Sequence, residues 1–180
     1  SEECNVQGYQ MRVFDSLNGA LGQGMTVLQL AEDIKNGMGW EELTQHRAPQ
    51  LIANTYPFFT LDTLEYLKRG GRISKTVALA GGLLNIKPVV TVRDGEVVLI
   101  GKARGSKQGN NLLAEKIHTC GGIDFSLPIL LGYSGLSDAF LKKYVEDSKA
   151  LWQDGAEKLD ATLISGVIGT HTGPGVVAAA

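Results

Sequence analysis

The sequence predicts a two-part α/β fold, in which a partial Rossmann-like parallel α/β unit precedes an α+β unit with an antiparallel hairpin. A strand-like run at 10–14 leads through a glycine-rich turn into a helical pattern, which is half of a βαβ unit. Further along, two runs rich in β-branched residues are joined by Asp94-Gly95, a dipeptide that favours a two-residue hairpin turn. A parallel unit and an antiparallel ribbon in one chain indicate two different parts.

The composition is that of a globular protein, and it excludes several classes. The chain has 180 residues, 43% of them hydrophobic, and a net charge of −2, whereas nucleic-acid-binding proteins are usually basic. The longest apolar runs, such as 127–131, are far shorter than the roughly 20 residues of a membrane-spanning helix. The acidic first residues and two isolated cysteines, Cys4 and Cys120, predict a cytoplasmic protein with neither a signal peptide nor a disulfide framework.

The first part, residues 1–56, is predicted to be a remnant of a Rossmann-like domain. After the strand at 10–14, apolar residues recur every three to four positions from Met25 to Ile34, as on one face of a helix. A second amphipathic helix is predicted over 40–53. Because one parallel strand can neither satisfy its edges nor bury both faces, we expect the beginning of this domain to be missing.

The second part, residues 57–165, opens with a sharply bounded short helix. Asp62 and Glu65 have the spacing of a capping box, and Gly70-Gly71 predicts a left-handed helix end. The elements that follow are strands at 88–92 and 96–100, a helix from Ser106, a strand at 127–133, a helix after Ser137 and a strand at 161–164.

Residues 166–180 are predicted to return to the interface between the two parts as a strand, a loop and an apolar tail. The loop has the sequence His171-Thr-Gly-Pro-Gly175, and successive amides around glycines can form an anion-binding nest. The His171 imidazole and the Thr172 hydroxyl add two further donors. A structural turn with a solvated histidine is the alternative interpretation.

Arg72 follows the two glycines that end the short helix, so a sharp turn can direct its side chain into a cleft. A guanidinium suits a carboxylate or a phosphate because its planar fork donates two parallel hydrogen bonds. The alternative is a surface arginine beside a helix end.

Two further motifs are weaker. Lys102, Arg104 and Lys107 place three cations within six residues, which suits a partner or phosphate contact, although most such runs are solvated faces. The glycines of 19–24 follow a strand and precede a helix but lack the GxGxxG order, so a plain strand-to-helix turn is favoured over a phosphate site.

The sequence shows no metal spacing among its three histidines, no GxSxG nucleophile elbow and no P-loop lysine, so neither a catalytic residue nor a metal site is predicted. An anion-binding cleft in an aliphatic-rich fold favours a binding protein that is not an enzyme. The alternative function is a stand-alone enzyme or binder for a small phosphorylated metabolite.

Four segments, in this order along the chain, resemble the DegV family. They are Phe14-Asp15-Ser16 with Gly22 and Gly24, residues 61–74 (LDTLEYLKRGGRIS), residues 83–88 (LLNIKP) and residues 169–175 (GTHTGPG). The resemblance covers most of the chain and implies the two-domain DegV-like (EDD) fold. It also implies that the N-terminal third of that fold, with loops that supply hydroxyl groups, is not among these 180 residues.

The resemblance further implies that one long-chain fatty acid, such as palmitate, stearate or oleate, is enclosed between the two domains, with no other cofactor. Some members are the lipid-binding subunit of a bacterial fatty acid kinase, which presents the carboxylate to an ATP-dependent kinase subunit that forms an acyl phosphate. By motif, the head-group residues are Arg72, His171, Thr172 and Gly173. The tunnel residues, which could equally be plain core, are Ile73, Leu83, Leu84, Ile86 and Pro88. The basic pair that docks on the kinase subunit is Arg104 and Lys107.

Overall fold

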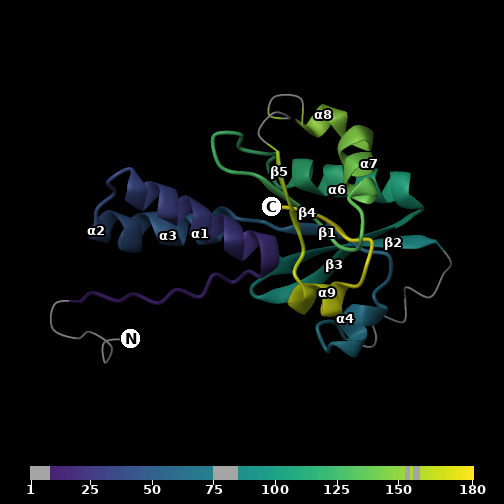
Figure 1. Cartoon of the computed structure of the whole chain (residues 1–180), viewed down its shortest axis with the longest axis horizontal. Helices are drawn as coiled ribbons and strands as arrows, with labels where there is room; N and C mark the ends of the chain where they lie inside the picture. Colours follow the sequence, from purple (N-terminus) through teal and green to yellow (C-terminus); the bar gives the residue numbers. More distant parts are fainter. Residues whose placement is uncertain (1–8, 75–84, 153–154, 156–158) are drawn as a thin grey trace.

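The computed structural model of this protein describes residues 9–74, 85–152, 155 and 159–180. These residues form a six-stranded mixed sheet with helices on both faces, which confirms the mixed α/β class (Figure 1). The strand order is β3-β2-β1-β6-β4-β5. The strands are β1 Phe58–Thr60, β2 Ile86–Arg93, β3 Glu96–Arg104, β4 Leu130–Tyr133, β5 Asp160–Leu163 and β6 Val177–Ala179.

The centre of the sheet is formed by two strands that lie more than 100 positions apart in the sequence. Phe59 of β1 pairs with Ala178 of β6 on one side and with Val90 of β2 on the other, and both pairings are antiparallel. β6 also pairs with β4 in antiparallel fashion, whereas β4 and β5 are parallel. β6 is therefore a central strand, and all three of its residues are buried.

The predicted hairpin is confirmed and is longer than the sequence pattern indicated. β2 and β3 pair from Ile86↔Arg104 to Arg93↔Glu96. The two turn residues, Asp94 with φ 52° and Gly95 with φ 77°, both lie in the left-handed region, as a type I′ turn requires.

The sheet separates two apolar cores. Phe58 faces the first core, with Leu113 and Tyr144, and Phe59 faces the second, because neighbouring strand residues point to opposite faces. The helices α6 Ser106–Thr119, α7 Ala139–Asp147 and α8 Lys149–Trp152 lie over the first core. The helices α4 Glu65–Arg69 and α9 Gly166–Thr172 lie together on the other side of the sheet (Figure 1).

A helical arm extends from one side of the sheet (Figure 1). It consists of α1 Ala20–Lys35, α2 Trp40–Glu42, the π-helical turn η2 Leu43–Arg47 and α3 Ala48–Asn54, which confirms both predicted helices. A partly buried ion pair fastens the arm, with Arg47 Nε 2.7 Å from Asp33 Oδ2. No helix among the described residues combines the length and the apolar character needed to cross a membrane.

Two strand predictions were wrong. Residues 10–14 form no strand, and Tyr9 and Val13 are 77% and 72% exposed, because no neighbouring strand among the described residues pairs with this segment. Val167 belongs to helix α9, where threonine hydroxyls donate to carbonyls four residues earlier, from Thr170 to Gly166 and from Thr172 to Ile168. The proposed domain boundaries at 56/57 and 165/166 stay predictions.

The capping box was also wrong. Helix α4 has no side-chain cap, and the Asp62 carboxylate instead forms an ion pair with Lys87 of β2. The Glu65 amide donates to the Thr63 hydroxyl at 3.2 Å. Of the two glycines that end the helix, Gly71 alone is left-handed, with φ 68°.

Candidate functional site

A hollow of about 260 Å³ lies between the sheet and the two short helices α4 and α9. We call it the α4–α9 hollow. Its apolar lining comes from all three of these regions, with Phe59, Val90, Val92 and Val97 from the strands, Leu67 from α4, and Val167 and Ile168 from α9. The remaining lining residues are Asn18, Gly19, Ala20, Arg72, Gly95, His171 and Thr172. Arg72 and His171, which were proposed from two separate sequence motifs, therefore line the same apolar hollow.

Arg72 reaches the hollow from the turn that follows α4. Its amide donates to the Leu67 carbonyl at 2.8 Å, which fixes the backbone, and its Nη1 donates to the Gly70 carbonyl at 3.0 Å. A guanidinium carries five N–H donors, so most of them are left for a ligand. No carboxylate of the described residues lies within ion-pair distance of Arg72.

His171 lies against Gly70. A β-carbon on Gly70 would overlap the Nδ1 atom of His171 and would lie 2.9 Å from Cε1. That Nδ1 atom is buried and has no hydrogen-bond partner. The two proposed head-group residues thus both contact Gly70, Arg72 through the carbonyl and His171 through the α-carbon.

Ser134, which is buried directly after β4, holds the loop after His171 in place through two hydrogen bonds. Its hydroxyl donates to the Gly173 carbonyl at 2.6 Å and accepts from the Val176 amide at 3.0 Å. Gly173 has φ 78°, and a β-carbon there would overlap the ring of Tyr66. Thr172 lines the hollow, while Gly173 is buried beside it as a structural residue of the turn.

The start of helix α1 adds positive potential to the same hollow. Gly19 is the N-cap of this 16-residue helix and has no side-chain cap, and both Gly19 and Ala20 line the hollow. The first amides of a helix have no partner within the helix and favour an anion. Gly22 and Gly24 lie inside α1, so the glycines of 19–24 do not form a phosphate loop.

The charges around the α4–α9 hollow select for an anion. Its described lining contains an arginine, a histidine and a helix N-terminus but neither aspartate nor glutamate. Seven of its lining residues are apolar side chains of valine, isoleucine, leucine or phenylalanine. Such a hollow suits a molecule with one anionic group and a hydrocarbon portion.

The other residues proposed from the sequence fall outside this lining. Ile73 packs against the second core, Ile86 is half-buried and Pro88 is fully buried in β2, so their role as tunnel walls stays a prediction. Leu83 and Leu84 lie outside the described residues.

Arg104 and Lys107 are both exposed, at the end of β3 and in the first turn of α6. Arg104 pairs with Ile86, at the end of the hairpin that adjoins the ion pair of Lys87 with Asp62. A β-carbon on Gly175 would lie 2.9 Å from that Asp62 carboxylate. Gly175, the last residue of the His171–Gly175 loop, therefore lies at the same end of the sheet as Arg104, whereas the α4–α9 hollow includes Gly95 at the turn end of the hairpin.

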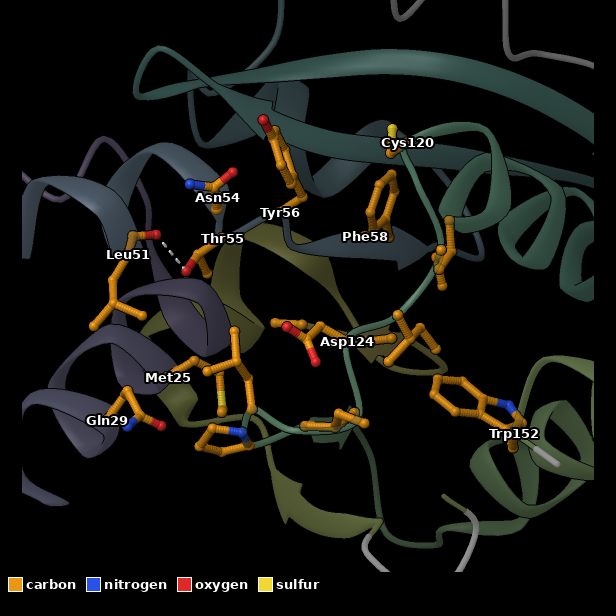
Figure 2. Close-up of a pocket in the computed structure, with 18 residues that line it drawn as sticks. Met25, Gln29, Leu51, Asn54, Thr55, Tyr56, Phe58, Cys120, Asp124 and Trp152 are labelled. Atoms are coloured by element: carbon orange, nitrogen blue, oxygen red, sulfur yellow. Dashed lines mark hydrogen bonds between the residues drawn. The ribbon is translucent and has the colours of Figure 1, made fainter. Parts of the chain in front are cut away.

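A second hollow, of about 150 Å³, lies on the first core between the arm and the loop at 120–129. Figure 2 shows Met25, Gln29 and Leu51 of the arm on one side and Trp152 on the other, with Asp124 between them. Hydrogen bonds from the Ser126 hydroxyl and amide lower the pKa of Asp124. Its described lining has no arginine, lysine or histidine, so a carboxylate is disfavoured here.

Sequence reasoning missed the strand residues that line the α4–α9 hollow and also Asn18. In the sequence, Phe59, Val90 and Val92 look like ordinary strand residues. Only the register of the central strands places them in the lining of the same hollow as His171. Asn18 donates through Nδ2 to the Thr55 carbonyl at 3.0 Å, a contact over 37 positions that no local pattern reveals. Among the described residues, no group of three or more His, Cys, Asp or Glu could hold a metal ion.

Known proteins resemble this chain in sequence and in fold. DegV domain-containing protein TTE1491 of Caldanaerobacter subterraneus subsp. tengcongensis is 32% identical over 171 residues, which are 94% of this chain and 59% of that protein. A solved DegV family protein from Thermus thermophilus, described as binding fatty acid, matches with a TM-score of 0.76 and 29% identity over 93% of this chain and 59% of its own.

The fatty acid kinase (Fak) B3 protein of Streptococcus pneumoniae, solved with linoleic acid, has a TM-score of 0.77 at 21% identity and covers 94% of this chain and 59% of its own. At that identity the likeness shows the fold alone. This chain thus spans about 59% of the length of each of these relatives. The family model for DegV proteins matches residues 2–180, almost every residue, and the chain belongs to the DegV family.

Proposed function

We propose that this protein binds one long-chain fatty acid, such as palmitate, stearate or oleate, with the carboxylate between Arg72 and His171. One observation carries the proposal: the Arg72 guanidinium and the His171 imidazole line a single apolar hollow whose described lining has no acidic residue. The fatty acid named for the Thermus relative supports the ligand class. Thr172 also lines the hollow, but its hydroxyl already donates to the Ile168 carbonyl, so the uncapped start of α1 is the further candidate donor.

The energetics of such a ligand fit the hollow. Burial of each methylene group contributes about 0.8 kcal/mol, so a hydrocarbon chain supplies most of the affinity. A carboxylate buried without donors would cancel much of that gain. The Arg72 guanidinium and the His171 imidazole offset this cost with charge-assisted hydrogen bonds. At about 260 Å³ the hollow is just below the roughly 300–1,000 Å³ of usual ligand pockets, enough for the head group and part of the chain.

Matched ligands test the carboxylate directly. The purified protein is stripped of lipid and titrated with palmitate and with hexadecanol, which has the same chain and no charge. We expect tighter binding of palmitate, and we expect Arg72→Ala to remove most of the difference between the two ligands. Equal binding of acid and alcohol by the unaltered protein would refute the proposed head-group site.

We further propose that the protein is a non-catalytic carrier that presents the carboxylate to a fatty acid kinase catalytic subunit through Arg104 and Lys107. Their exposure, and the position of Gly175 at the same end of the sheet as Arg104, support this role. In a binding assay with such a subunit, Arg104→Ala should weaken association, whereas Lys35→Ala on the distant arm should not. Unchanged association of Arg104→Ala together with Lys107→Ala would refute the docking role.

A further inference from the structure

We propose that Gly70 is a positioning residue for His171, because the imidazole occupies the space that a side chain at position 70 would fill. This inference rests on the proposed function of His171 in binding the carboxylate. It explains the presence of a glycine at a position where the backbone conformation does not itself require glycine.

The backbone at position 70 is ordinary. Gly70 has φ −74° and ψ −3°, a right-handed conformation that every residue adopts readily. Its neighbour Gly71, with φ 68°, has the left-handed conformation that favours glycine. An alanine at 70 would also be a better helix former at the end of α4. The reason for a glycine at 70 therefore lies in what surrounds it.

What surrounds it is the imidazole of His171. A β-carbon at 70 would overlap Nδ1, and Cε1 and Cγ would lie 2.9 Å and 3.2 Å away, closer than packed atoms tolerate. The backbone after His171 is also closely packed, with Gly173 against the ring of Tyr66, so a β-carbon at 70 must displace the imidazole. The α-carbon of Gly70 thus sets the place of the ring.

The same contact determines which ring nitrogen serves the ligand. Nδ1 is buried against Gly70 without a hydrogen-bond partner. A proton on Nδ1 would bury an unpaired N–H donor, so the favoured neutral ring carries its proton on Nε2. Nε2 is then the donor for a carboxylate. Because the Gly70 carbonyl also accepts from Arg72 Nη1 at 3.0 Å, one small residue orients both proposed head-group side chains.

A double-mutant cycle tests the proposal. Gly70→Ala should weaken palmitate binding by about tenfold or more, the effect of losing one hydrogen bond to a charged group. In a His171→Ala background the same substitution should cost no further affinity, because the ring that it displaces is gone. The matched control is Gly169→Ala, on the same helix as His171, where a β-carbon meets nothing within 4 Å. An equal loss from Gly70→Ala in both backgrounds would overturn the proposal.

A measurement without lipid separates this inference from the proposed function. The three histidines can be assigned in ¹⁵N spectra by comparison with His171→Ala. His171 should show a proton on Nε2 in the unaltered protein and a changed ring environment in Gly70→Ala but not in Gly169→Ala. If the His171 signals are the same in Gly70→Ala, the positioning role of Gly70 is refuted. If they shift while His171→Ala binds palmitate normally, the positioning role of Gly70 is supported and the proposed head-group role of His171 fails.

Discussion

Arg72 and His171, almost 100 positions apart, both contact Gly70: Arg72 Nη1 donates to its carbonyl at 3.0 Å, and the His171 imidazole lies against its α-carbon. This contact joins the turn after α4 to the end of α9 and places a guanidinium and an imidazole at one apolar hollow. The pairing of β1 with β6 holds the two segments on the same side of the sheet. The proposed ligand site is therefore a product of the central strand register.

Replacement of Arg72 by lysine should weaken fatty acid binding less than replacement by alanine. Lysine keeps the positive charge but loses the planar fork that donates two parallel hydrogen bonds. Arg72→Ala should cost about 1.5–3 kcal/mol of binding free energy, the range for hydrogen bonds to charged groups. Titration with palmitate at constant ionic strength measures both losses.

Folding is the control for these variants. Arg72 is exposed, and its side chain donates a hydrogen bond to the Gly70 carbonyl, so thermal unfolding should change little. Tighter binding of palmitate by Arg72→Ala than by Arg72→Lys would contradict the role of its charge.

Acid should destabilise the helical arm through Asp33. Burial raises the pKa of this carboxyl, but hydrogen bonds from Arg47 and Gln29 outweigh burial and hold it below its usual 3.8. The unfolded carboxylate therefore binds its proton at higher pH than the folded one, and the stability that the pair contributes is full above pH 3.8 and is lost as the pH falls through the lowered value. Unfolding followed by circular dichroism between pH 6 and 2, at steps of about one unit, should show this loss.

Arg47→Ala should remove that pH-dependent contribution and cost about 2 kcal/mol at neutral pH, since it leaves a partly buried carboxylate with one fewer donor. Lys35→Ala is the matched control on the same arm, because the Lys35–Glu32 pair is exposed and such pairs contribute little. Equal effects of the two substitutions would show that the Arg47–Asp33 pair does not stabilise the arm.

Ser134→Ala should loosen the loop that carries His171. The substitution removes the hydroxyl that bonds the Gly173 carbonyl and the Val176 amide, both of them buried. Leaving such groups unpaired costs about 1–3 kcal/mol each. Chemical denaturation should show the loss of stability, and palmitate affinity should fall with it. Ser137→Ala removes only an exposed hydroxyl that accepts from the Ala139 amide at 3.2 Å, so it should cost less stability and should leave palmitate affinity unchanged.

Two glycine substitutions should have opposite signs. Gly24→Ala should stabilise the protein by up to about 1 kcal/mol, because Gly24 lies inside α1 and a β-carbon there meets nothing within 4 Å. Gly173→Ala should destabilise it, because φ is 78° and the β-carbon would overlap Tyr66. Thermal unfolding of both variants tests the contrast, and a shift of the same sign would contradict the described packing.

Local patterns in the sequence predicted the elements that depend on neighbouring residues. The Asp94-Gly95 hairpin and the helices of the arm were found, because a type I′ turn and an amphipathic face leave local signals. The segment at 10–14 has the composition of a strand, but strand formation depends on a partner that composition does not reveal. Val167 likewise has a β-branched side chain and lies in a helix.

The site divides in the same way. Arg72 and His171 were proposed from the sequence because a guanidinium and an imidazole beside glycines have a distinctive local chemistry, and their role in binding a ligand stays a prediction. The apolar lining, with Phe59 and Val90, was not, because it depends on the pairing of β1 with β2 and β6. Gly70 was interpreted as a left-handed helix end, and only its contact with His171 shows why a glycine stands there.

Isothermal titration of lipid-free protein with palmitate, compared across Arg72→Ala, His171→Ala and Arg104→Ala, tests the central claim most directly. The account predicts one site per chain, a loss of about tenfold or more for each of the first two variants, and unchanged affinity for Arg104→Ala. Equal affinity of all four proteins, or no binding of palmitate to the unaltered protein, would contradict it.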